Sequence, residues 1–477
     1  MRRIIGRGGI AWALAAVLVL AGFEAAAESH NVNIEKVAAS AAAAQISSTC
    51  AVPEDPAEAR PSDTLLTFVG SDSVGSKLVP CLAVLYLKNL GSRITRAVRL
   101  NDTDLRIVGT LDNGRAVAIE IIATRSSEAF QALLDKKADF GMSSREIRPA
   151  EARALASLGD MTSKAAETPV ALGGVVVIVN RANPVKGMTL DTVRDVFSGK
   201  ISDWSQLGAP PGPIRTVART VGSASRELFE DEVMRNLPLA FGTSELTENK
   251  DITEALAANP LAIGFTSMEE IGPTKPLAIG YSTEYLLLPS RETILTEDYV
   301  LARRLYLYRA PGRDSANIQR FLRLAESYEG KLHVALSGLV PMGIDLVAPD
   351  IQQPRPKNVR DLVTNGIRVG VPLHFDADRM TLSNETEKGL DHIAVFLRNL
   401  RVSITSLRLI GYAGVDPASE DLRQLSLAMV NEVGNELTKR LVPVGIKVGL
   451  GGIMPLDSED TPRGRARNRR VEIWLTP

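Results

Sequence analysis

The sequence is poor in the residues on which common enzyme mechanisms depend. Its 477 residues include only 4 histidines, 2 cysteines and 5% aromatic residues, and the net charge is −1. The chain therefore lacks the strong net positive charge that is typical of many proteins that bind nucleic acids or membrane surfaces. The G-x-S-x-G motif of serine hydrolases and the H-E-x-x-H motif of zinc proteases do not occur. We therefore predict that the protein is not an enzyme, carries no cofactor or metal, and has no nucleic-acid partner.

The N-terminal segment has the pattern of an export signal. Arg2, Arg3 and Arg7 precede the apolar run IAWALAAVLVLAGF, and small residues follow around Ala27. The apolar run is too short to favour spanning a bilayer, so the pattern predicts a cleaved signal peptide over residues 1–27. Phe23 occupies the place where a lipoprotein would need its lipidated cysteine. We expect an unlipidated protein of the periplasm.

Residues 28–62 are rich in alanine, serine and proline and lack strand periodicity. This composition predicts a flexible leader. The leader contains Cys50, whereas Cys81 falls on the first predicted helix that follows it. An exported protein with two cysteines can form one disulfide, but two free thiols are equally compatible with the sequence.

From Thr64 onward, short apolar runs alternate with segments of helical periodicity. Examples are the strand patterns LLTFVG and PVALGGVVVIVN, and the helical patterns SKLVPCLAVLYLKNL and TLDTVRDVFSG. Alternating strands and helices predict parallel α/β sheets, here over residues 63–345. Three prolines and mixed charge then predict a linker over residues 346–365. Residues 366–477 form a second region, with the predicted order β-α-β-α-β-β.

Polar turns follow the predicted strands at four places in the first region. They are GSDSVGSK (70–77), ATRSSEAF (123–130), DFGMSSRE (139–146) and RTVGSASREL (219–228). A helix N-terminus presents free N–H groups and partial positive charge, so such turns can hold an anion. Arg145 or Arg219 could supply a planar guanidinium for a tetrahedral oxyanion. The alternative for each turn is an ordinary N-cap, but four in one region favour an oxyanion site.

The first of these turns nearly matches the phosphate-binding loop of nucleotide-binding proteins. That loop reads G-x-x-x-x-G-K-[ST], whereas here Ser76 precedes Lys77. Because the lysine is displaced, we interpret the turn as part of a site for a free oxyanion rather than for a nucleotide.

The motifs VGSDSVG, RSS, ADFGMSSRE and R-T-V-G-S-A-S-R-E-x-F give region 63–345 a resemblance to a known family. It resembles the substrate-binding proteins of phosphate ABC transporters (PstS-like), which are two-lobed type II periplasmic binding proteins. The resemblance implies phosphate held between two lobes and an ABC permease as a possible partner. Carried over by position, with Arg145 added as a further cation, the implied ligand-binding residues are Ser71, Asp72, Ser73, Ser126, Ser144, Arg145, Arg219, Ser223, Ala224 and Ser225.

Two positions depart from the family pattern. Members that discriminate phosphate from sulfate often carry an aspartate where this chain has Ser144, because a carboxylate accepts the proton of hydrogen phosphate and repels a fully ionised anion. Asp72 in the first turn could take that role; otherwise sulfate or another oxyanion could bind. Ala224 replaces a glycine, which costs little unless the backbone there requires a positive φ.

Residues 366–477 resemble the OmpA-like peptidoglycan-binding domain, an α+β fold of order βαβαββ. The resemblance rests on HFDADRMTLSNE, LIGYAG, LSLAMVNEV, GLGGIMP and NRRVEI. It implies that an aspartate and an arginine grip the diaminopimelate of the wall peptide, but this chain has Gly414 and Met429 at those positions. Asn468 and Arg470 remain, and could either contact glycan or stabilise the fold. We do not expect the usual grip on peptidoglycan, and a different docking partner is the alternative.

Together these patterns predict a periplasmic phosphate or oxyanion receptor for ABC-type uptake or sensing, with an envelope-associated OmpA-like region behind it. The alternative is a structural cell-envelope protein whose binding-like region has lost or changed its ligand.

Overall fold

The computed structural model describes residues 63–347, 355–371, 373–375, 382, 384–400 and 406–476, together with Cys50. Apart from Cys50, the described residues all belong to one compact unit, which spans Glu54–Pro477. The predicted signal peptide (1–27) and, apart from Cys50, the predicted leader (28–62) lie outside the described residues. Both cysteines are disulfide-bonded, which resolves the choice that the sequence left open in favour of a disulfide.

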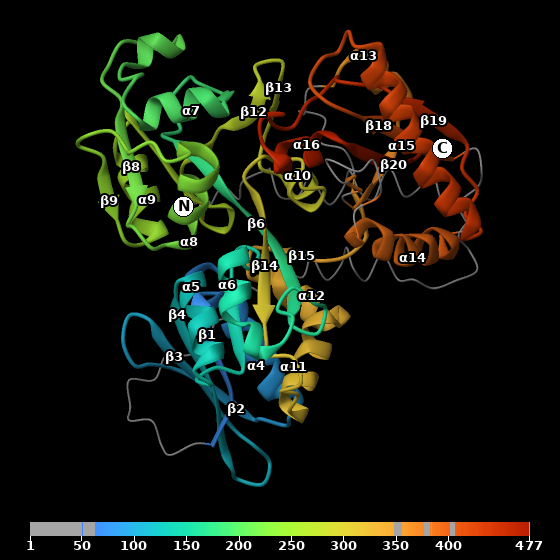
Figure 1. Cartoon of the computed structure of the whole chain (residues 1–477). Helices are drawn as coiled ribbons and strands as arrows, with labels where there is room; N and C mark the ends of the chain where they lie inside the picture. Colours follow the sequence, from blue (N-terminus) through green and yellow to red (C-terminus); the bar gives the residue numbers. More distant parts are fainter. Residues whose placement is uncertain are drawn as a thin grey trace, which may run out of the picture. The chain divides into compact units, whose positions relative to one another are not determined.

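One twelve-stranded sheet organises the first region of the unit Glu54–Pro477 (Figure 1). Its strands follow the order β2-β3-β4-β1-β5-β14-β6-β10-β8-β9, and β11 and β15 add to β6. The strands are β1 (Asp63–Ser71), β2 (Ile94–Arg99), β3 (Asp104–Thr110), β4 (Ala116–Thr124), β5 (Phe140–Ser143), β6 (Glu167–Val179), β8 (Arg215–Arg219), β9 (Ser244–Leu246), β10 (Ala262–Ser267), β11 (Lys275–Pro276), β14 (Ala302–Tyr308) and β15 (Val340–Pro341).

The long strand β6 divides this sheet into two lobes. Residues Glu167–Gly174 of β6 pair with the antiparallel strand β14, whereas Val175–Val179 pair with β10. We call the part containing β1–β5 lobe 1 and the part containing β8–β10 lobe 2. In lobe 1 the central strand β1 pairs in parallel with β4 and β5, and in lobe 2 β8 pairs in parallel with β10. The α/β class predicted from the sequence is therefore confirmed.

Helices cover both lobes. Lobe 1 carries α3 (Asp72–Gly75), α4 (Leu78–Asn89), α5 (Ser126–Leu134), α6 (Pro149–Ala154), α11 (Ala316–Glu326) and α12 (Tyr328–Leu336), and lobe 2 carries α7 (Leu190–Phe197), α8 (Ala224–Phe229) and α9 (Asn249–Ala258). Helix α7 illustrates the local rules: the side chain of Thr189 accepts from Thr192 N–H at its start, and Gly199 follows its end with φ +83°. Among the described residues, no helix combines the length and apolarity needed to cross a membrane.

A three-stranded sheet of β7 (Gly187–Thr189), β12 (Ala278–Ser282) and β13 (Tyr285–Leu287) lies beyond lobe 2, and helix α10 (Arg291–Leu295) follows it. The C-terminal region has its own five-stranded sheet in the order β16-β17-β20-β18-β19. Its elements are β16 (Asp345–Val347), α13 (Lys357–Val363), β17 (Ile367–Gly370), α14 (Asn384–Asn399), β18 (Leu407–Tyr412), α15 (Glu420–Lys439), β19 (Ile446–Gly449), α16 (Pro462–Asn468) and β20 (Arg470–Leu475).

The segment predicted as a linker, 346–365, is largely built into this fold where it is described. Strand β16 pairs with β17 and so supplies an edge of the C-terminal sheet. Helix α13 starts after Pro356, a residue type that suits a helix start, and buries Val359 and Val363 in a core. Proline marked the beginning of a helix here rather than a free connection. Residues 348–354 lie outside the described part of the chain.

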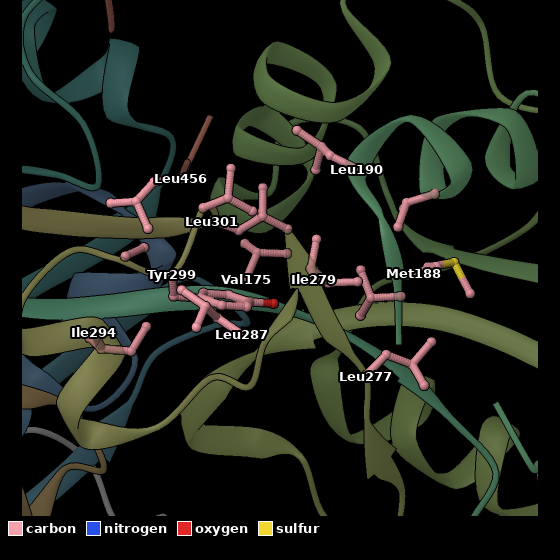
Figure 2. Close-up of a cluster of buried hydrophobic side chains, with 14 of the residues drawn as sticks. Val175, Met188, Leu190, Leu277, Ile279, Leu287, Ile294, Tyr299, Leu301 and Leu456 are labelled. Atoms are coloured by element: carbon pink, nitrogen blue, oxygen red, sulfur yellow. The ribbon is translucent and has the colours of Figure 1, made fainter. Parts of the chain in front are cut away.

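Lobe 2 and the C-terminal region share a hydrophobic core. Figure 2 shows Leu456 of the C-terminal region in one cluster with Tyr299 and Leu301, which precede β14. Trp474 of β20 belongs to the same cluster and is completely buried. Burying this apolar surface at roughly 25 cal/mol per Å² favours folding of the two parts together.

Candidate functional site

Two of the predicted polar turns meet inside lobe 1. Ser126 begins α5 after β4, and Ser144 directly follows β5. Because β4 and β5 flank β1 in parallel, their carboxyl ends lie at one edge of the sheet. The two hydroxyl oxygens are 3.2 Å apart, and Ser144 N–H donates to Ser126 Oγ at 3.3 Å. Both side chains are buried, so this pair can present hydroxyl groups to a ligand only from within the protein.

Asp72 connects this edge of lobe 1 to lobe 2. Its Oδ1 accepts from Ser73 N–H at 2.8 Å and from Ala224 N–H at 3.2 Å, and its Oδ2 lies 3.4 Å from Arg219 Nη2. Arg219 ends β8 and Ala224 starts α8. The carboxylate thus lies against the positive end of α8 and a guanidinium, which both stabilise negative charge.

Donors remain unused in this neighbourhood. Ser71 Oγ and Arg219 Nε are buried and have no hydrogen-bond partner among the described residues. The remaining described contact of the Arg219 guanidinium is a hydrogen bond from Nη1 to Asn249 Oδ1 at 2.5 Å. Buried donors without a partner are rare in folded proteins, because their desolvation is not compensated. Several other described arginines also have an Nε without a hydrogen-bond partner, so it is the position of Ser71 and Arg219 beside Asp72 that makes them candidate donors to an oxyanion.

The loop before α8 and the start of that helix contain three of the predicted ligand residues, Ser223, Ala224 and Ser225. Ser223 Oγ accepts from Arg226 N–H at 3.3 Å, so this serine is an N-cap. Ser225 Oγ lies 3.0 Å from Ser267 Oγ and is buried. Gly222 has φ +94°, and a Cβ there would lie 2.9 Å from Arg125 Cδ of lobe 1. Ala224 begins the helix without a positive φ, so alanine fits where the family has glycine.

Arg145 is not placed with this group. Its guanidinium donates to both carboxylate oxygens of Glu151, at 2.7 and 2.8 Å, and through Nε to Glu227 of lobe 2 at 2.8 Å. Although burial lowers its pKa, the hydrogen bonds and charges of Glu151 and Glu227 raise it above the ordinary value. Arg145 is predicted above as an anion ligand, but its guanidinium donates instead to Glu151, to Glu227 and to the carbonyl oxygen of Glu146.

Ion pairs join the two lobes around the site. Besides Arg145 with Glu227, Lys77 Nζ lies 2.5 Å from Glu270, and Arg148 lies 2.9 Å from Asp231. The lysine that seemed misplaced for a phosphate loop therefore pairs across the lobes.

Sequence reasoning missed Arg303. This arginine lies on β14 and is buried, and it donates to Ser73 Oγ at 2.8 Å and to Ala224 O at 2.9 Å. It sits in the run ARRLYLY, which reads only as a strand, so no local signal could have assigned it to the site.

The candidate wall contacts of the C-terminal region face inward. Asn468 Oδ1 accepts from the N–H groups of Leu456 and Asp457, and its Nδ2 donates to Asp457 O. The Arg470 guanidinium stacks on the Tyr412 ring at 4.1 Å and donates to Met454 O at 3.1 Å. Both side chains are buried. Of the two roles that the sequence left open for them, contact with glycan and support of the fold, these contacts favour the second: they hold the loop after β19.

The chain is similar in sequence to known phosphate-binding proteins. Residues 111–324 match the family model described as a PBP superfamily domain. The phosphate-binding protein PstS of Pseudomonas aeruginosa is 24% identical over 243 residues, covering 47% of this chain and 75% of that protein. PstS of Staphylococcus epidermidis is 25% identical over 211 residues, covering 42% and 63% respectively. A phosphate-bound putative phosphate ABC transporter substrate-binding protein from Clostridium perfringens aligns with a TM-score of 0.47 at 22% identity, covering 59% of this chain and 100% of that one.

Proposed function

We propose that residues 63–345 bind inorganic phosphate, or a closely similar oxyanion, between the two lobes in the periplasm. The bound anion would then be presented to an ABC permease for uptake or reported to a sensing partner. The observation that carries the proposal is the meeting of Asp72, Arg219 and the Ala224 N–H across the lobes. The similarity to phosphate-binding proteins supports it.

Each residue has a distinct task in this proposal. Arg219 and the start of α8 supply positive charge, while Ser71, Ser73, Ser126 and Ser144 supply hydroxyl groups that can donate to oxygen. Asp72 selects among anions, because its carboxylate accepts the hydrogen of protonated phosphate and repels sulfate, which carries none. The position of Asp72 beside Arg219 supports its taking the role that other members give to the residue at position 144.

Isothermal titration of the mature protein with phosphate and with sulfate tests this proposal. We expect phosphate to bind, and Arg219→Met to weaken it about 10- to 100-fold, the equivalent of one charge-assisted hydrogen bond. Arg215→Met is the matched control, because Arg215 lies on the same strand β8 but is exposed. Asp72→Asn should shift the affinity ratio toward sulfate by about tenfold or more. If titration with phosphate and with sulfate both give no heat of binding, the alternative of a structural envelope protein is favoured.

We further propose that the C-terminal region is OmpA-like and associates with the envelope through contacts other than the usual diaminopimelate grip. The element order β17-α14-β18-α15-β19-β20, interrupted only by the short helix α16 before β20, supports the first part. The burial of Asn468, Arg470 and Met429 supports the second. Cell fractionation should place part of the full-length protein with the envelope, and free diaminopimelate should not release it from purified peptidoglycan. Full recovery in the soluble periplasmic fraction, or release by diaminopimelate, would contradict this assignment.

A further inference from the structure

A ring of hydrogen bonds connects Asp72 with Ser73, Arg303 and Ala224. Its carboxylate accepts from the N–H groups of Ser73 and Ala224. Ser73 Oγ and Ala224 O in turn both accept from Arg303, at 2.8 and 2.9 Å. Ser73 belongs to lobe 1 and Ala224 to lobe 2, so a single guanidinium bridges the lobes next to the proposed anion site.

Arg303 is placed for this task by the strand that carries it. It faces Gly173 across the β14–β6 pair, at the point where β6 passes from one lobe to the other. The residue is only 7% exposed. Burial lowers the pKa of Arg303, and the charges of Glu269 and Asp72 oppose this shift.

We propose that Arg303 is a positioning residue for the anion site, which rests on the function proposed above. A hydroxyl group has one hydrogen and two acceptor lone pairs. Since Arg303 donates to Ser73 Oγ, the hydroxyl hydrogen of Ser73 is directed away from the guanidinium and can be donated to an oxyanion. The second bond, to Ala224 O, ties that serine to the first turn of α8. Arg303 therefore orients a ligand-binding hydroxyl and holds the lobes in the closed arrangement.

A double-mutant cycle on phosphate binding tests this role. We expect Arg303→Met and Ser73→Ala each to weaken phosphate binding about 10- to 100-fold, and the double variant to be little weaker than the worse single variant. Non-additivity is expected because Arg303 acts through Ser73. Arg303→Lys should recover part of the affinity, since an ammonium can reach one acceptor but lacks the fork. Additive losses, or phosphate binding unchanged in Arg303→Met, would overturn the proposal.

Two further measurements separate positioning from general stability. Small-angle scattering should show that saturating phosphate compacts the wild-type protein but not Arg303→Met. Arg304→Met is the matched control: it is the next residue of β14, and its Nε donates to Glu297 at 2.6 Å, outside the ring around Asp72. This control should retain both affinity and compaction. If Arg303→Met does not fold, the Arg303→Lys and Ser73→Ala arms still decide the question. Wild-type protein that binds neither phosphate nor sulfate would refute the proposed function itself, whereas normal wild-type binding with a normal Arg303→Met refutes only this inference.

Discussion

The ion pair between Arg368 and Asp298 makes a sharp prediction about how the chain folds. Arg368 lies on β17 of the C-terminal region, and both of its Nη atoms donate to Asp298, in the segment between α10 and β14. Both side chains are buried. Glu472 of β20 lies 3.4 Å from the same guanidinium. Burial alone would raise the pKa of Asp298, but the charge and hydrogen bonds of Arg368 lower it below its ordinary value.

Replacing Arg368 with methionine should therefore lower the free energy of unfolding by about 3–5 kcal/mol, the usual cost of removing one partner of a buried pair. Arg470, whose Nε lies 3.5 Å from Glu472, still compensates that carboxylate, but Asp298 loses its main cation. Its pKa should then rise above the ordinary value, so the deficit relative to the wild type should shrink as the pH falls through that raised pKa and on to the lowered pKa of the wild-type carboxyl group. Arg423→Met is the control, because Arg423 pairs with Glu420 while 60% exposed, and should cost about 1 kcal/mol or less.

Urea unfolding with and without phosphate is the assay. Phosphate at 100 times its dissociation constant should stabilise the lobes by about 2.7 kcal/mol and so mark their transition. We expect Arg368→Met to lower the urea midpoint of that same phosphate-sensitive transition, because the ion pair joins the C-terminal region to the segment that leads into β14. If this transition keeps its midpoint while a separate one moves, the two regions fold independently and the reasoning is refuted.

Further predictions concern single residues. Gly70→Ala should lower the melting temperature strongly, because Gly70 has φ +131° and its Cβ would lie 2.2 Å from Met142 O, whereas Gly114→Ala, with φ +80° and open space, should cost only about 1 kcal/mol. Burial lowers the pKa of His374 to about 4, so as the pH falls the unfolded chain is protonated at this residue before the folded chain is. Chemical denaturation should therefore show stability lost between about pH 6.5 and pH 4, and His374→Phe should reduce this dependence of stability on pH. Lys77→Met should change phosphate affinity in titration less than about fivefold, because this lysine is 42% exposed in its pair with Glu270. Asn468→Ala should lower the melting temperature without changing the amount of protein bound to peptidoglycan, since the hydrogen bonds of its side-chain amide are all made within the protein.

Local sequence rules accounted for much of the fold. The polar turns lie where strands end, and parallel pairing of β4 and β5 with β1 brings Ser126 to Ser144, although 18 residues separate them. Asp72 and Arg219 are 147 residues apart, and only the crossing of β6 between the lobes brings them together. As ligand-binding residues they remain a prediction.

The failures share one cause, which is that side-chain partners are set by tertiary structure. Arg145 looked available because neither of its carboxylate partners is adjacent in sequence: Glu151 follows six residues later on α6, and Glu227 is 82 residues away. Arg303 looked like an ordinary charged residue of a strand, and its acceptors are 79 and 230 residues away. The linker was predicted from its proline content and mixed charge. Val359 and Val363 of this segment are nevertheless buried, so helix α13 is part of the folded region.

The arginine-rich segment from Arg463 to Arg470 illustrates how such partners change a functional interpretation. Five arginines in eight residues could suggest a surface for nucleic acid. In the structure, Arg463 pairs with Glu232 of lobe 2, and Arg467 donates to the carbonyls of Glu297 and Tyr299 at 2.7 and 2.9 Å. These charges are used to attach the C-terminal region, so a phosphodiester backbone could reach Arg467 only by undoing that attachment. The carbonyls that Arg467 holds lie a few residues before Arg303 on the same chain. One short, hydrogen-bonded segment thus connects the C-terminal region to β14, the strand that carries Arg303.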